Sequence, residues 1–505
     1  MVMTTIPLPA WLPDMASLNS PGLAMAYNVY PLPGNGGPGT VTYAPVPSAQ
    51  KYSDSTLPEV INSACIGTDR FSSPHVYAAT ATKLWTYLSS ARQWSDVSKA
   101  GDYISSATET WNWIQYGTSV IGTSFVNAPQ WISCDDVTAK FADLTTVVRG
   151  RHIAQHKGFV LLANCYDSFD GEVPNRLRWS AIDNPFDWSF SQATMADFQD
   201  LQDVGAIQGM VVDEDLWIFC KQAIIRGQFV GSPWVYEFSE AVSGRGLAYP
   251  NSLITIDGVS YFLDDDGFYS FKKGQIDPIG VGKINLTFYK NFDTNSAAQM
   301  TVVADPRRTI IKWNYADKAS PNGLPNKTII YNYVSRDWTI CDSQVPYEFQ
   351  AQSLAWTIED LSNAYGAIEN IPAPFDSPLW AGGNAILWAV NEAGNILTLT
   401  GPPIRGTIET TDYQLGTTLK NPVDMALVQR VRPIVEGDGR ATVSIAGRRT
   451  QKGDINFENE FETNASTGFA YVRAACRYHR FKINLYGAWD LASAIDVDFV
   501  GFGGR

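Results

Sequence analysis

Residues 258–271, GVSYFLDDDGFYSF, carry the pattern that decides the fold class. Two short runs rich in aromatic and apolar residues flank Asp264-Asp265-Asp266-Gly267. Such runs favour strands, and an Asp-Gly step between them supplies the positive φ angles that tight hairpin turns use. The stretch therefore predicts a β-hairpin with its turn at the Asp-Gly step.

The same theme recurs through residues 61–405 without repeating its letters. An apolar strand, a turn, a second strand with Trp or Tyr and a loop follow one another in HVYAATATKLWTYL (75–88), GMVVDEDLWIFC (209–220), RTIIKWNY (308–315), NKTIIYNYVSRDWTIC (326–341) and AILWAVNEAGNILTL (385–399). Repeated units of this kind are typical of β-propeller blades. We expect an all-β chain with a propeller of about six blades at 61–405, five or seven also fitting the spacing. A series of unrelated sandwiches is the alternative.

The two flanks of this region differ from it. Residues 1–60 are rich in Pro, Gly, Ser and Asn, which predicts an extended N-terminal arm, or else a disordered tail. Residues 406–505 alternate like the strands of a C-terminal β-sandwich. This last region is locally basic, and its arginines are candidates for ionic contacts with a partner or with the next subunit, a solvated face being the alternative. The candidates are Arg430, Arg432, Arg448, Arg449, Arg477 and Arg480.

Composition narrows the classes of function. The 505 residues are 45% hydrophobic and 17% charged, with a formal net charge of −14, which fits a globular protein and argues against tight nucleic-acid binding. An acidic wall would let DNA slide past without sticking. The six cysteines form no CxxC pair, so we expect reduced buried thiols. Neither a signal peptide nor an apolar run long enough to span a membrane is visible, which predicts assembly in the cytoplasm.

Few residues suggest chemistry. His152 and His156 could bind zinc from one helix face, but the surrounding RHIAQHKGFVLLANC reads as two strands. The carboxylates Asp264–Asp266 could bind calcium, and Asp213–Asp215 could serve a glycosidase, but acids gather at turns in every strand-rich protein, so a solvated hairpin tip is the better interpretation of the former. No GxSxG elbow, P-loop or sialidase Asp-box is present. We expect no enzymatic activity, no cofactor and no metal.

One longer stretch, Asn175–Trp188 (NRLRWSAIDNPFDW), reads as a corner that closes a blade. Arg178 and Trp179 alternate on a strand, Asp183 and the following Asn can form an Asx-turn ahead of Pro185, and Trp188 can fold back onto the blade.

This stretch resembles a signature of tail hub, or nozzle, proteins of short-tailed bacteriophages, a group that includes the packaged-DNA stabilisation proteins of P22-like phages. Segments 216–231, 246–271, 430–437, 476–480 and 487–490 follow in the same order. The resemblance implies a structural virion protein that forms a ring, expected to be a hexamer, below the head-to-tail connector.

Such a ring would extend the DNA channel and help to retain packaged DNA. The resemblance implies as partners the connector or adaptor ring, the tailspike or tail fibre, the tail needle, and double-stranded DNA that passes through the lumen without sequence-specific binding. Its location would be the virion tail, after assembly in the host bacterial cytoplasm. The alternative is a propeller glycan hydrolase or lectin acting at the host surface.

Overall fold

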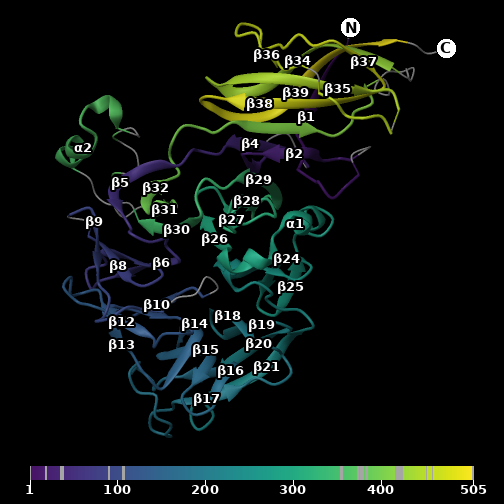
Figure 1. The fold of residues 1–505 in the computed structure, drawn as a ribbon. Coiled ribbons are helices and arrows are strands. Elements are labelled where there is room, and N and C mark those ends of the chain that lie inside the picture. The colour runs from purple at the N-terminus through teal and green to yellow at the C-terminus, as the bar shows by residue number, and fades with distance from the viewer. Residues whose placement is uncertain are drawn as a thin grey trace.

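The computed structural model describes residues 2–16, 20–34, 39–88, 91–104, 109–352, 357–371, 375, 380, 385–415, 425–450, 452–457 and 459–502. Strands dominate these residues, and they are grouped into a ring of small sheets with a layered β-structure against one side of the ring (Figure 1). The all-β class and the β-propeller are confirmed.

The ring consists of antiparallel four-stranded units, each a blade that runs outward from the central axis. Six are separate sheets and one is the end of a nine-stranded sheet, so the described residues form seven blades, one more than the six expected. The first four blades are β6–β9 (Ser63–Thr68, Pro74–Ala79, Leu84–Leu88, Gln93–Asp96), β10–β13 (Asn112–Tyr116, Ser119–Thr123, Gln130–Ser133, Ala142–Asp143), β14–β17 (Val148–His156, Phe159–Asp167, Gly171–Trp179, Asp197–Asp200) and β18–β21 (Ile207–Val212, Leu216–Cys220, Ala223–Phe229, Tyr236–Ser243). The other three are β22–β25 (Ile254–Ile256, Val259–Asp264, Gly267–Lys272, Gln275–Pro278), β26–β29 (Thr301–Asp305, Ile310–Tyr315, Lys327–Asn332, Asp337–Asp342) and β30–β32 with β5 (Tyr347–Gln352, Ala385–Val390, Asn395–Thr398, Gln50–Thr56).

The ring is closed by a strand from the N-terminal segment. β5 pairs with β32 as the outer strand of the last blade, and the inner strands β30 and β6 of the last and first blades contact each other. Two distant parts of the chain therefore build one blade, which removes a free sheet edge. Helix α1 (Asn285–Asn291) lies between β25 and β26, and α2 (Ile358–Tyr365) lies between β30 and β31.

Apolar side chains fill the wedges between neighbouring blades. One wedge joins Tyr87 of the first blade to Trp388 of the last, and another joins Leu161 of the third blade to Ile218 of the fourth. Residues on the opposite face of the same strand pack against the other neighbour, so Val160 and Leu162 belong to the wedge with the second blade. Strands such as β15 and β19, second in their blades, are thus buried on both faces, which explains their near-continuous apolar runs in the sequence.

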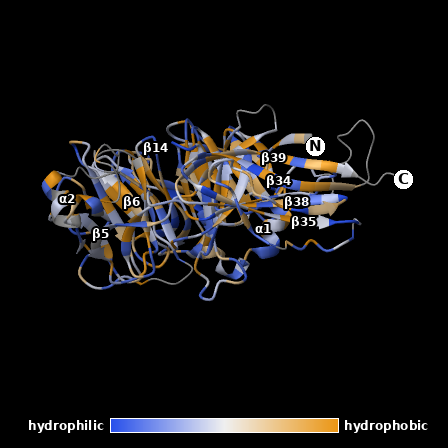
Figure 2. Cartoon of the chain, turned by 90° about the horizontal axis from the view of Figure 1, so that it is seen from above, coloured by the Kyte–Doolittle hydropathy of each residue, from blue (hydrophilic) through white to orange (hydrophobic). Residues whose placement is uncertain are grey.

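The layered part is built from both ends of the chain. One sheet contains β3 (Val29–Pro33), β4 (Val41–Pro45), β39 (Trp489–Phe502), β34 (Met425–Gly437) and β37 (Ala474–Cys476), with β1 (Val2–Pro7) also on β39. The other continues from the sixth blade through β2 (Leu23–Tyr27) to β33 (Gly406–Thr410), β38 (Tyr478–Tyr486), β35 (Arg440–Arg448) and β36 (Phe461–Glu462). Apolar and polar residues alternate along these strands (Figure 2), and their inner faces share one core with the fifth and sixth blades.

Three sequence expectations are corrected. Residues 1–60 are not an extended arm, because β1, β2, β4 and β5 pair with strands hundreds of residues away and β3 pairs with β4. Residues 406–505 do not form the layered part alone, because N-terminal strands contribute to each of its sheets. β1, β3 and β4 belong to one sheet, and β2 belongs to the other. The hairpin at 258–271 exists, but its loop residues Asp265 and Asp266 are not among the positive-φ residues; those angles occur one turn earlier, at Asp257 and Gly258.

Candidate functional site

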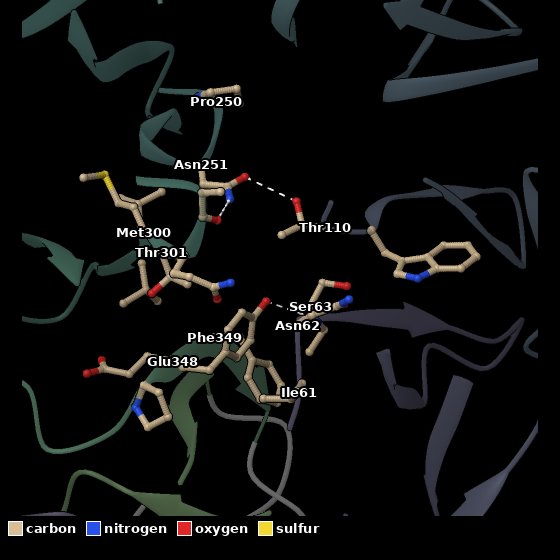
Figure 3. Close-up of a pocket in the computed structure, with 18 of the residues that line it drawn as sticks. Ile61, Asn62, Ser63, Thr110, Pro250, Asn251, Met300, Thr301, Glu348 and Phe349 are labelled. Atoms are coloured by element: carbon tan, nitrogen blue, oxygen red, sulfur yellow. Dashed lines mark hydrogen bonds between the residues drawn. The ribbon is translucent and has the colours of Figure 1, made fainter. Parts of the chain in front are cut away.

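The inner strands surround a cavity on the axis of the propeller. A compartment of about 360 Å³ is lined by residues at the start of inner strands, such as Thr301 and Glu348, and by residues that precede such strands, such as Asn62 and Asn251 (Figure 3). The Asn251 amide donates to the carbonyl of Ala298 (2.8 Å), which fixes one wall.

A second compartment of about 450 Å³ adjoins the first and shares Thr110, Asn112 and Asn251 with it. It is lined by residues of the second to fifth blades, among them Glu109 and Arg151. Their side chains form an ion pair with 3.0 Å between Arg151 Nη2 and Glu109 Oε1. Burial raises the pKa of Glu109, and the charge of Arg151 partly offsets that rise. Both compartments have the volume of small-molecule sites.

Each carboxylate that lines the cavity forms an ion pair with a basic side chain. Among the lining residues of the two compartments, Glu109 and Glu348 are the acidic ones, and each has a basic partner, Arg151 and Lys312 respectively. Lys312 and Glu348 are both buried and lie on neighbouring blades. Glycoside hydrolysis needs two carboxyl groups facing each other across the sugar, one of them free to give up a proton. This arrangement does not supply that pair.

The corner at residues 175–188 is anchored by buried side chains. Trp188 is 4% exposed, packs in the wedge between the second and third blades, and donates from Nε1 to the carbonyl of Pro185 (2.9 Å). The buried Arg178 pairs with Asp167 and reaches the Trp188 carbonyl (3.3 Å). Trp179 Nε1 donates to the carbonyl of Met195 (2.8 Å).

The turn within this corner also follows the expected chemistry. The Asn184 side chain accepts from the amide of Phe186 (3.2 Å), which makes an Asx-turn around Pro185. Asp183 has a φ of 55°, and its amide donates to the carbonyl of Gly158 (3.0 Å) in the turn of the neighbouring hairpin. A Cβ at Gly158 would lie 2.4 Å from Asp183 Oδ1, so glycine is required there by both close approach and its own φ of 85°.

Four of the six candidate interface arginines have acidic partners within the chain. Arg430 faces Asp498 (2.7 Å) across β34 and β39, and Arg432 faces Asp496 in the same ladder. On the other sheet Arg448 pairs with Asp412, and Arg480 pairs with Glu409 (2.8 Å). These four are therefore not the free basic surface that the sequence suggested. Arg477 is half-buried with its guanidinium over the Tyr478 ring, and Arg449 is exposed.

The remaining candidate ligands do not form a metal site. His152 and His156 lie on β14, and His156 bonds the Tyr236 hydroxyl (3.0 Å). Asp264 is 7% exposed and lies near Arg245, so the expected solvated hairpin tip is wrong for this carboxylate. Within the described ranges, no group of three His, Cys, Asp or Glu side chains could hold an ion.

The interpretation that the sequence lacks a G-x-G-x-x-G pattern is wrong, because residues 34–39 (GNGGPG) match it. It lies between the antiparallel strands β3 and β4 and not between a strand and a helix, the context that dinucleotide binding requires. Across the described part of the chain, no helix has the length and apolar character that crossing a bilayer demands.

Comparisons with known proteins give the fold and no more. No family model and no curated protein matches the chain. It is similar to the Neurospora crassa Pan2 WD40 domain (7% identity, 67% of this chain, 88% of that one, TM-score 0.35) and to YCF48 bound to D1 peptide (9%, 70%, 97%, 0.35). It is also similar to the extracellular domain of the BT4673 one-component system from B. thetaiotaomicron (10%, 84%, 47%, 0.36). Likenesses this weak carry no argument about function.

Proposed function

We propose that this chain is a structural, non-enzymatic subunit of a bacteriophage tail, which forms the nozzle or hub ring below the head-to-tail connector. The observation that carries the proposal is the resemblance of residues 175–188 to the nozzle signature, together with the way those residues are used. They form a corner whose buried side chains tie two blades together. Residues used in this way support a structural role for the protein.

The continuous sheet from the sixth blade into the C-terminal layers supports a mechanical role. β29 and β33 both pair with β2, so the propeller and the layers share one nine-stranded sheet and one apolar core. Domains joined by a small polar interface move relative to each other by default, whereas a shared sheet and core hold them rigidly. A ring subunit that must bear the pressure of packaged DNA benefits from such rigidity.

The DNA channel of the proposed assembly lies between subunits. The axial compartments of about 360 and 450 Å³ have the size of small-molecule sites and are far too small for a duplex. Several copies around a common axis, in this proposal six, would enclose the lumen. The net charge of −14 suits a lumen that DNA crosses without adhering.

The glycan hydrolase alternative has less support, because Glu109 and Glu348 are both ion-paired. The interface arginines also need revision, since Arg430, Arg432, Arg448 and Arg480 already have partners. Arg449 remains as a candidate contact to the connector or the next subunit.

The proposal is tested by locating the chain in virus particles. Purified virions of a phage whose genome encodes this chain are analysed by quantitative mass spectrometry with the portal protein as internal standard. We expect the chain in every particle at a fixed ratio to the portal protein. Its absence from purified virions, with abundant free protein in the lysate, would refute a structural role in the tail.

A further inference from the structure

Two irregular residues on neighbouring blades line the second axial compartment. Asn164 lies in β15 opposite a register irregularity, because Ala163 pairs with Leu177 and Cys165 with Val173, so the extra residues belong to β16; its own φ is 55°. Gln208 is the extra residue of a bulge in β18, where the register with β19 shifts between Ile207 and Gly209. Bulges redirect side chains and are common beside binding sites. Here the side-chain amides beside both irregularities line one cavity.

The amide of Asn164 presents an acceptor. Its Nδ2 donates to the carbonyl of Ile207 (3.0 Å), which fixes the orientation of the group, because the reverse orientation would oppose two oxygens. Asn164 is 3% exposed, and its Oδ1 has no hydrogen-bond partner in the protein. A buried acceptor without a partner costs free energy, so this oxygen favours a ligand that donates.

His152 presents a second acceptor to the same compartment. The side chain is 8% exposed, and Nε2 has no partner in the protein. Burial, followed by the charge of Arg151, lowers its pKa to about 4, which a hydrogen bond to the backbone of Ile207 only partly offsets. The ring is therefore neutral near pH 7. With the proton on Nδ1, Nε2 keeps its lone pair and can accept a hydrogen bond.

The charges of the compartment compensate one another. Arg151 is paired with Glu109, and His152 is neutral, so a ligand with a net charge would find no unpaired opposite charge there. Ala206, Ala248 and Ala297 keep the wall small and leave a volume of about 450 Å³. The site thus offers acceptors at His152 and Asn164, and an amide at Gln208 that can both donate and accept.

We propose that the compartment bounded by His152, Asn164 and Gln208 binds a small, neutral, hydroxyl-rich ligand, a single sugar unit or a cyclic polyol. Hydroxyl groups both donate and accept, so they satisfy the two acceptors and the amide together. The compartment binds this ligand without turning it over, because its carboxylate, Glu109, is held by Arg151. This inference is independent of the tail assignment.

The test is calorimetric titration of the full-length protein at pH 7 with glucose, galactose, mannose, rhamnose, N-acetylglucosamine and myo-inositol, with glucosamine and glucuronate as charged comparators. Dextran and mannan distinguish a free sugar from the end of a polymer. Asn164→Gly removes the amide and keeps the left-handed backbone, and Gln208→Ala is the second variant. Asn28→Gly is the matched control, because Asn28 has a φ of 57° and lies outside the cavity.

We expect saturable binding of at least one neutral probe, weakened at least tenfold by Asn164→Gly and by Gln208→Ala and unchanged by Asn28→Gly. Near-ultraviolet circular dichroism verifies that each variant is folded. Absence of binding for every neutral probe would overturn the proposal. So would binding of the charged comparators alone, or binding that both cavity variants leave unchanged.

Discussion

The blade corner (residues 175–188) and the arginine ladder (Arg430 and Arg432 of β34 with Asp498 and Asp496 of β39) are both held by polar contacts with buried groups. Their partners come from very different distances along the chain. In the corner, Trp188 bonds the carbonyl three residues before it, and Arg178 pairs with an aspartate 11 residues away. In the ladder, Arg430 meets Asp498 and Arg432 meets Asp496, 68 and 64 residues later. Local contacts leave a readable motif in the sequence. When the partners are distant in the sequence, only a local excess of positive charge is visible, without the carboxylates that pair with it.

This difference explains why the basic stretch was misinterpreted as a free interface. A net charge along the sequence becomes a surface charge only if the fold brings no opposite charge to it. Strand β39 brings Asp496 and Asp498 to the arginines of β34, and both carboxylates are buried. These two arginines thus neutralise carboxylates that the fold places beside them.

The largest expected effect concerns the corner. Trp188→Ala should lower the free energy of unfolding by about 3–5 kcal/mol, because it empties a buried aromatic site between two blades. Chemical denaturation monitored by circular dichroism gives the value. Phe186→Ala, at a side chain 50% exposed in the same corner, should cost much less. Equal losses would mean that the corner is not packed as described.

A second test uses the buried histidine of the layers. His479 is 0% exposed, and burial lowers its pKa to about 4. The unfolded state, with a pKa near 6.5, binds the proton first, so this group's stabilisation is complete above that pH and is lost as the pH falls towards 4. Between pH 7 and pH 5 the loss should be about 2 kcal/mol. His479→Asn should flatten the profile of unfolding free energy against pH, and an unchanged slope would show that water reaches the ring.

The ladder should show a smaller effect than the corner. Arg430→Ala leaves Asp498, 1% exposed, without its cation and should cost about 1–3 kcal/mol. Arg449→Ala, at an exposed position, should stay within about 0.5 kcal/mol. Denaturation of the two variants side by side measures the contrast. If Arg430→Ala were as harmless as Arg449→Ala, the pairing across β34 and β39 would contribute nothing to stability.

The smallest expected effect is that of a chelator. The corner and the ladder are both held by protein groups, so EDTA should leave the melting temperature unchanged within error. A bound structural ion would otherwise contribute through linkage. A downward shift reversed by calcium or zinc would show that ligands such as Asp264 had been misinterpreted.

Much of the propeller could be predicted from the sequence, because each blade is built from consecutive strands joined by short turns. The buried Trp188 and the Asx-turn at Asn184 followed from residues within one corner. The seventh blade could not be counted, since its outer strand β5 comes from the opposite end of the propeller region. Pairings such as Val2 with Phe499 leave no local pattern, which is why the N-terminal strands were expected to be an arm.

The axial cavity lay beyond sequence reasoning for a related reason. His152 was noticed only as half of a pair with His156, and Asn164 and Gln208 were not noticed at all. Both amides lie at register irregularities, Asn164 opposite the extra residues of β16 and Gln208 as the extra residue of β18, and alternation in the sequence does not reveal a bulge. The residue type at position 164 was the one available hint, because asparagine is among the residues that tolerate the positive φ found there.

The central claim, that the chain is a ring subunit assembled on a connector, is tested most directly by observing that assembly. Like charge on neighbouring subunits opposes spontaneous closure, whereas a preformed connector ring offers several docking sites at once. Light scattering of the pure protein at micromolar concentration should therefore show a monomer or small oligomer. Electron microscopy after mixing with connector-bearing heads should show a closed ring, expected to be a hexamer, below the connector. Heads that remain bare, with the protein monomeric beside them, would contradict the account.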